Sequence, residues 1–258
     1  MSTQRSIVSK VTKALCFAAA ALACTPALGR STAPEGRPST RACPSTVVQG
    51  QEEAYRLQGC TTVRGDLTIE KTALESLNGF GSLEAVTGTL RIADNPKLES
   101  LEGLERLRRV RSLVVNNNPE LESLEALRSL RSARDVLVHE SPRLETFRGL
   151  ERVRSLRSLI VSRVGIYSTV GLDGVREVGN LAFVDNPRLI SLRGLKALRN
   201  ASSIRITGNN RLAPEQGFLA ALERVPGPFV IEGNASLSAA DVESMEARAR
   251  GRVSVAAR

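Results

Sequence analysis

Few residue types in this sequence could support catalysis. His139 is the single imidazole among 258 residues, and it lies in the local run "VHES", without the separately placed acid and nucleophile that a catalytic triad needs. Carboxylates are plentiful but recur at regular intervals, so choosing two as an acid and base pair would be arbitrary. The sequence has neither a glycine-rich phosphate loop nor the ligand spacing of a metal site. We therefore expect a non-enzymatic protein without a cofactor, with His139 as a surface residue of a strand.

The N-terminal residues indicate export. Residues 1–23 combine basic residues with the apolar run "ALCFAAAALA" and end at a small-residue site, which is the order of a signal peptide. The following "ALAC" at 21–24 resembles the lipobox of bacterial lipoproteins, which makes Cys24 the candidate lipidated residue of an outer-membrane or cell-surface protein. Cleavage after Ala23 or Gly29 without lipidation, which would give a periplasmic or secreted protein, is the alternative.

Export also bears on the other cysteines and on the charge. Cys16 would leave with the signal peptide, so Cys43 and Cys60 remain, and two such cysteines in an exported chain suggest one disulfide. Removal of residues 1–23 takes away three positive charges and no negative ones, so the formal charge falls from +9 to +6. Residues 24–42 are rich in Pro, Ser, Thr and Gly, which predicts a flexible tether before a domain at 43–258.

The sequence also contains an internal repeat, which would position these candidate residues. Pairs of apolar residues two positions apart recur every 22 to 25 residues, and an alternation of this kind predicts strands. The nine pairs are Leu67 and Ile69, Leu90 and Ile92, Leu113 and Val115, Val136 and Val138, Leu159 and Val161, Leu181 and Phe183, Ile204 and Ile206, Phe229 and Ile231, and Val253 and Val255. Units this short cannot bury an apolar face alone, so we expect stacked coils with parallel strands about 4.8 Å apart.

Each unit continues from its strand through a bend into a return segment. In the third unit, leucines follow at every third position, which is typical of a tight helix or a turn-by-turn coil: Leu121, Leu124, Leu127 and Leu130. An asparagine recurs at the bend, where its side chain is expected to point into the coil and bind open backbone groups: Asn95, Asn118, Asn186, Asn209 and Asn234. Ser141 and Val164 depart from this pattern, so a local distortion is expected near the short fifth unit.

The unit "LVVNNNPELESLEAL" resembles the leucine-rich repeat, and "CTTVRGDLTI" from Cys60 is similar to the first strand of receptor L domains. The resemblance covers about residues 43–255. It implies a right-handed α/β solenoid of eight to nine units with a parallel sheet on one face, an N-terminal disulfide cap at 43–65 and a binding role. It names no ligand. A C-terminal cap at 238–258 is expected to hold a helix with Ser238 as N-cap, Asp241 three residues on and Gly251 as C-cap, followed by a last strand in "RVSVAAR".

Charged residues fall into columns when the units are aligned. One column, here called the arginine ladder, has Glu84 and Glu223 at its ends and contains Arg108, Arg131, Arg154, Arg176 and Arg199. A shorter arginine column holds Arg111, Arg134 and Arg157, and an acidic column holds Glu75, Glu99, Glu122 and Glu145. The ladder is either an ordinary solvated face, in part paired with the acidic column, or a site for an anionic partner. Arg128 has Glu105 and Glu151 at its position in adjacent units, so it should matter least.

One outward residue lies between the two inward residues of each strand. The central four form an apolar stripe of Val114, Leu137, Ile160 and Ala182, and Arg91 and Arg205 border it. Such a stripe on an exposed sheet is typical of a partner surface. The alternatives are that the tether or the C-terminal helix covers it, or that isolated apolar residues are tolerated there.

Three functions are compatible with these surfaces. The first hypothesis is a cell-surface recognition module that binds a protein or glycan. The second is a structural adhesion or envelope-scaffold protein that self-assembles through its sheet face. The third is a binder of anionic polymers through the arginine ladder, with nucleic acid the weakest candidate because no aromatic residues interleave with the arginines.

Overall fold

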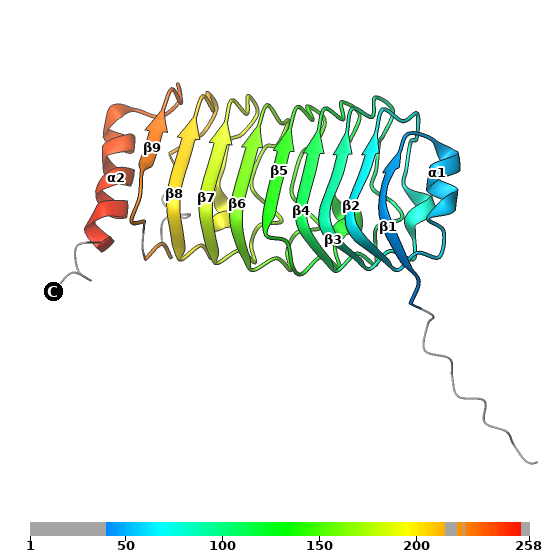
Figure 1. Cartoon of the computed structure of the whole chain (residues 1–258). Coiled ribbons are helices and arrows are strands. Elements are labelled where there is room, and N and C mark those ends of the chain that lie inside the picture. Colours follow the sequence, from blue (N-terminus) through cyan, green and yellow to red (C-terminus); the bar gives the residue numbers. More distant parts are fainter. Residues whose placement is uncertain (1–39, 215–220, 224, 254–258) are drawn as a thin grey trace, which may run out of the picture. The chain divides into compact units, whose positions relative to one another are not determined.

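The computed structural model describes residues 40–214, 221–223 and 225–253 (Figure 1). This part of the chain winds as a solenoid around one nine-stranded parallel sheet, in which the strands follow one another in chain order. The predicted repeat fold with a parallel sheet on one face is confirmed. The strands are β1 (Ala42–Val48), β2 (Thr62–Glu70), β3 (Ala85–Ala93), β4 (Arg109–Asn116), β5 (Asp135–His139), β6 (Ser155–Ser162), β7 (Glu177–Val184), β8 (Asn200–Thr207) and β9 (Phe229–Glu232).

The apolar pairs position the strands as the sequence predicted. In β4, Leu113 and Val115 are fully buried, whereas Val114 between them is only half-buried, because successive side chains of a strand point to opposite faces. The first eight pairs occupy β2 to β9. The ninth expected strand is wrong in part, because Val253 is the last residue of a helix, and Val255 lies outside the described residues.

The return segments close the coils with tight turns, and three of the described segments contain a very short helix. The predicted three-residue period of leucines appears as 3₁₀ turns, and the four return leucines of the third unit have no exposed surface. The 3₁₀ helices are η1 (Asn78–Phe80), η2 (Glu125–Leu127) and η3 (Arg193–Leu195). Strand and return residues together form one continuous core of Leu, Val and Ile, to which Phe80, Phe147 and Phe183 add the largest buried side chains.

The bend asparagines form a buried hydrogen-bonded ladder, as expected. The Nδ2 group of Asn118 donates to the carbonyls of Ile92 at 3.0 Å and Asn116 at 3.1 Å, and its Oδ1 accepts from the amide and Nδ2 of Asn95. Asn186, Asn209 and Asn234 repeat this arrangement farther along the solenoid. Buried backbone groups must be paired, and the ladder supplies hydrogen-bond partners for backbone groups at the bends.

The asparagine ladder is interrupted in the middle of the solenoid. Ser141 and Val164 occupy its two central positions and are fully buried, and the Ser141 hydroxyl bonds only within its own coil, to the carbonyl of His139. The strands pass this region without a shift in register between β5, β6 and β7. The expected distortion therefore does not reach the strands.

The residue before each bend position has a left-handed backbone, which turns the chain sharply off the strand. The sequence interpretation did not include this column: Lys71, Asp94, Asn117, Glu140, Arg163 and Asp185 have φ between 49° and 57°, and Gly208 and Gly233 take the last two positions. Such φ values cost free energy for non-glycine residues, so the stacked coils must impose them.

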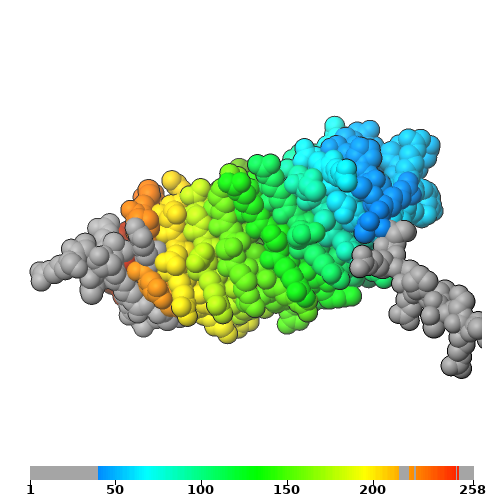
Figure 2. Space-filling model, turned by 60° about the horizontal axis from the view of Figure 1, so that its bottom comes forward, coloured from blue at the N-terminus to red at the C-terminus, as the bar shows by residue number. Residues whose placement is uncertain are grey.

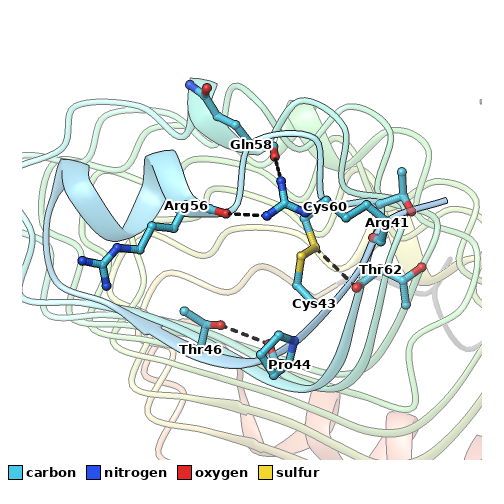
Figure 3. Close-up of a disulfide and its surroundings, with 9 residues drawn as sticks. Arg41, Cys43, Pro44, Thr46, Arg56, Gln58, Cys60 and Thr62 are labelled. Carbon is cyan, nitrogen blue, oxygen red and sulfur yellow. Dashed lines mark hydrogen bonds between the residues drawn. A yellow bond between two sulfur atoms is a disulfide. The ribbon is translucent and has the colours of Figure 1, made fainter. Parts of the chain in front are cut away.

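The N-terminal end of the solenoid is closed by β1, by α1 (Gln51–Arg56) and by the expected disulfide between Cys43 and Cys60 (Figure 3). The Arg41 guanidinium spans the same cap, because it donates to the carbonyls of Gln58 at 2.8 Å and Arg56 at 3.4 Å. The sequence indicated the cap but not its strand and helix. β1 begins at Ala42, the last residue of the stretch expected to be a tether, and residues 1–39 lie outside the described part.

The C-terminal end is covered by α2 (Ala239–Val253), which packs beside β9 (Figure 1). The predicted capping pair is confirmed: the Ser238 hydroxyl accepts from the Asp241 amide at 3.2 Å, and the Asp241 carboxylate accepts from the Ser238 amide at 2.9 Å. Gly251 as C-cap is wrong, because α2 continues through it to Val253. A glycine inside a helix costs only about 1 kcal/mol relative to alanine, so it does not by itself end the helix.

Candidate binding surfaces

The outer face of the sheet carries the apolar stripe. Register places Val114 opposite Leu137, Leu137 opposite Ile160 and Ile160 opposite Ala182, with Arg91 and Arg205 at the two ends. The four apolar side chains are half-buried, because each is flanked on both sides by the residues of adjacent strands. They still form one uninterrupted apolar row, and α2 packs beside β9 at one end of the sheet rather than over this row (Figure 1).

A second row of the same face is polar and holds a buried carboxylate. Asp135 is only 4% exposed, and it accepts hydrogen bonds from the Nε and Nη2 groups of Arg157 and from the Ser112 hydroxyl. Burial alone would raise the pKa of Asp135, but these bonds and the nearby charges of Arg157 and Arg134 hold it below its usual value. The sequence placed Arg157 in a column of like charges, and the structure shows that it is paired.

His139 lies on the outer face at the end of β5, where it is half-buried. Its Nδ1 atom is 2.6 Å from the Ser162 hydroxyl on β6. Burial lowers the pKa of His139, and Arg163 lowers it further, against the opposing effect of Glu140. Sequence reasoning missed this pair, although the 23-residue period places Ser162 next to His139. No third side chain orients the imidazole in the described part of the chain, and no cluster suited to a metal ion occurs there.

The arginine ladder lies at the edge where the strands begin. Backbone hydrogen bonds confirm its register on both sides of the step from Arg131 to Arg154, since the amide of Arg108 donates to the Glu84 carbonyl and the amide of Arg131 to the Arg108 carbonyl. The same bonds join Arg176 to Arg154, Arg199 to Arg176 and Glu223 to Arg199. All five ladder arginines are exposed.

The acidic column also exists but does not pair with the ladder. Backbone bonds run from the Glu99 amide to the Glu75 carbonyl and from the Glu122 amide to the Glu99 carbonyl, which sets these residues after the bend, in the return segments. Among the described residues, Arg199 is the ladder arginine that forms a salt bridge, and its partner is Glu223 at 4.0 Å. The suggested pairing of the two columns is therefore not found.

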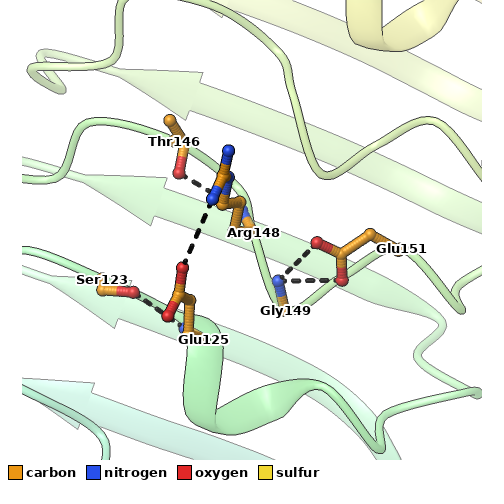
Figure 4. A network of polar contacts seen from close by, with 6 residues as sticks. All are labelled: Ser123, Glu125, Thr146, Arg148, Gly149 and Glu151. Carbon is orange, nitrogen blue, oxygen red and sulfur yellow. Dashed lines mark hydrogen bonds and ion pairs between the residues drawn. The ribbon is translucent and has the colours of Figure 1, made fainter.

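Glu105 and Glu151, which occupy the position of Arg128 in adjacent coils, bind backbone amides of their own turns. Both carboxylate oxygens of Glu151 accept from the amide of Gly149, at 3.1 and 3.0 Å, beside a 4.0 Å ion pair between Arg148 and Glu125 (Figure 4). Glu105 binds the amide of Gly103 in the same way. Arg128 itself is exposed and lies outside the ladder.

The N-terminal cap also has a hollow of about 720 Å³ beside α1. It is lined by the exposed ring of Tyr55 and by amide side chains such as Gln49, Gln51 and Asn78.

No helix in the described residues is long and apolar enough to cross a bilayer. Cys24, the candidate lipidation site, falls outside those residues.

Comparison with known proteins supports the interpretation of the repeat. Residues 59–149 match the family model of the receptor L domain, a ligand-binding domain without enzymatic activity. A search of the curated proteins finds no match. The matched segment begins beside Cys60 and includes β2 to β5, and the same coil continues beyond it to β9. Residues 59–149 are therefore similar to a receptor L domain, and they form part of a longer parallel-sheet solenoid.

Proposed function

We propose that the protein is a non-enzymatic recognition module that binds a protein or glycan partner on the outer face of its sheet. The observation that carries this proposal is the register that joins Val114, Leu137, Ile160 and Ala182 into one apolar row between two arginines. Apolar rows with a charged rim are typical of partner surfaces, and the receptor L domain is a ligand-binding module.

Partner capture by full-length chains tests the proposal. The double variant Leu137→Asp and Ile160→Asp places two charges in the row and is expected to lose the partner that the native chain retains. Ile190→Asp is the control, because Ile190 is exposed outside the sheet. Retention of every partner by the double variant, with an unchanged circular dichroism spectrum, would rule out the row as the site.

Self-assembly through the same face is the second candidate. The finding that favours it is that no described segment covers the apolar row. Sedimentation velocity of the native chain and of the double variant separates the two functions. Dimers or larger assemblies that the double variant abolishes would support a scaffold, and a monomer at all concentrations would support recognition of another molecule.

We also propose that the chain is exported and anchored at the cell surface through a lipid on Cys24. The support is the order of residues 1–24, in which a basic segment, an apolar run and "ALAC" follow one another. Mass spectrometry of the mature N-terminus tests this. A diacylglyceryl group on Cys24 is expected, whereas an unmodified Cys24 or a start at Arg30 would indicate a periplasmic or secreted protein.

A further inference from the structure

The edge of the solenoid where strands β4 to β8 begin is unusually basic. This edge faces the viewer in Figure 2, where the coils follow one another as adjacent bands. Two acidic residues, Asp135 and Glu177, lie among nine exposed arginines there, which leaves a net charge of +7. The nine arginines, here called the basic edge, are Arg108, Arg109, Arg111, Arg131, Arg134, Arg154, Arg157, Arg176 and Arg199.

Few of these charges are neutralised within the described chain. Arg157 is paired with Asp135, and Arg199 is 4.0 Å from Glu223. Salt bridges are absent, among the described residues, for Arg108, Arg109, Arg111, Arg131, Arg134, Arg154 and Arg176. Like charges on successive coils repel one another, so the edge is electrostatically suited to an anion that bridges several coils.

The opposite edge, where the strands end, is built differently. There Arg163 is paired with Glu140 at 2.8 Å, and Asn117 donates to Asp94 at 2.9 Å. Arg143, in the return segment that follows, is paired with Glu120. A general excess of arginine would load both edges alike, so the unpaired charge at one edge is a specific feature of this surface.

We propose that the basic edge is a binding track for a linear acidic polysaccharide, with about one acidic sugar over each coil. Successive coils of a parallel sheet are about 4.8 Å apart, which is close to the length of one sugar ring. The guanidinium group matches carboxylate and sulfate groups with two parallel hydrogen bonds. A straight row of such groups suits a polymer that carries one charge per unit.

The composition of the edge disfavours other polyanions. The exposed large apolar side chains of the described residues are Val47, Tyr55 and Ile190, and none of them lies on the basic edge. Single-stranded nucleic acid is typically bound with aromatic stacking platforms, and surfaces that insert into membranes combine basic residues with apolar side chains. The ladder arginines of the track are also separate from the apolar stripe, because Arg108 and Val114 are six residues apart, or about 20 Å along an extended strand.

Binding of the full-length chain to polygalacturonate, a linear polyuronate, tests the proposal by titration calorimetry across salt concentrations. The ladder variant Arg108→Gln, Arg131→Gln and Arg154→Gln is expected to bind at least about tenfold more weakly. Its affinity should also depend less steeply on salt, because binding with fewer arginine contacts releases fewer counterions. The matched control is Arg128→Gln, Arg143→Gln and Arg163→Gln, which removes the same charge elsewhere and should bind as the native chain does.

Four results would overturn the proposal. Equal binding by the ladder variant would exclude the track, and an equal loss in the control variant would show that only net charge matters. Monomeric galacturonate that binds as tightly as the polymer would exclude a polymer track. Double-stranded DNA and vesicles of phosphatidylglycerol and phosphatidylcholine serve as competitors, and ladder-dependent binding to either that exceeds binding to polygalacturonate would assign the edge to another class of partner.

Discussion

Arg157 on β6 donates two hydrogen bonds of 2.8 Å to the two carboxylate oxygens of Asp135 on β5. Ser112 on β4 donates to the same carboxylate at 3.0 Å. Three consecutive strands are thus joined by side chains on the outer face, in addition to their backbone bonds. This is the one buried carboxylate of the described residues, and it lies between the basic edge and the apolar stripe.

We expect Asp135→Asn to lower the free energy of unfolding by about 1 kcal/mol at neutral pH, because it removes a charge-assisted pair that solvent partly screens. The folded pKa of Asp135 is lowered, so its stabilisation is complete above the unfolded pKa of about 3.9 and is lost as the pH falls through the folded pKa. Urea unfolding of both proteins across pH measures this difference. A difference that stays constant into the acid range would contradict the role of the charge.

Asn118→Ala should lower the free energy of unfolding by about 3 kcal/mol, because it removes the buried bonds that the Asn118 side chain makes with the Ile92 carbonyl and with the amide and Nδ2 group of Asn95. The control is Asn117→Gly, which removes an exposed neighbouring asparagine and keeps a residue that tolerates the local φ of 51°. Chemical unfolding compares the two variants. Equal losses would show that the asparagine ladder adds no stability beyond that of a surface residue.

Gly149→Ala should be costly for two separable reasons. Gly149 has φ 107°, and a Cβ there would lie 2.1 Å from the Leu124 carbonyl of the preceding coil. Gly59 also has a positive φ, but a Cβ there would meet nothing within 4 Å. We expect Gly59→Ala to cost about 1 kcal/mol and Gly149→Ala about 3 kcal/mol. Thermal unfolding measures both, and similar costs would mean that the coils are less closely stacked than this contact requires.

His139 should titrate below its ordinary pKa of about 6.5, because burial and Arg163 disfavour its charged form. Its neutral form therefore stabilises the fold above the unfolded pKa, and that contribution is lost as the pH falls through the folded pKa. Since His139 is the only histidine, proton NMR of its imidazole gives the pKa directly. Ser162→Ala is the companion variant, and a pKa at or above the ordinary value in the native chain would contradict the expectation.

Much of the fold followed from the spacing of residues such as Leu113 and Val115. An inward pair at every 22 to 25 residues fixes which side chains are buried, and the same period fixes which residues become neighbours on adjacent coils. The period of the repeat therefore places the arginine ladder, the apolar stripe and the bend asparagines in columns from the sequence alone. The capping pair of Ser238 and Asp241 is local and was equally accessible.

The structure departs from the sequence predictions at the two ends of the repeat and wherever pairing depends on the distance between side chains. β1, α1 and the continuation of α2 through Gly251 belong to the caps, which have no second copy to reveal a pattern. Arg157 pairs with Asp135, whereas the arginine ladder and the acidic column do not pair with each other. This difference depends on the direction of each side chain and on distances of a few ångströms. The sequence by itself determined the columns of this solenoid, because the repeat dictates register. Only the tertiary structure decided which charges in those columns are neutralised, because pairing requires the two side chains to meet.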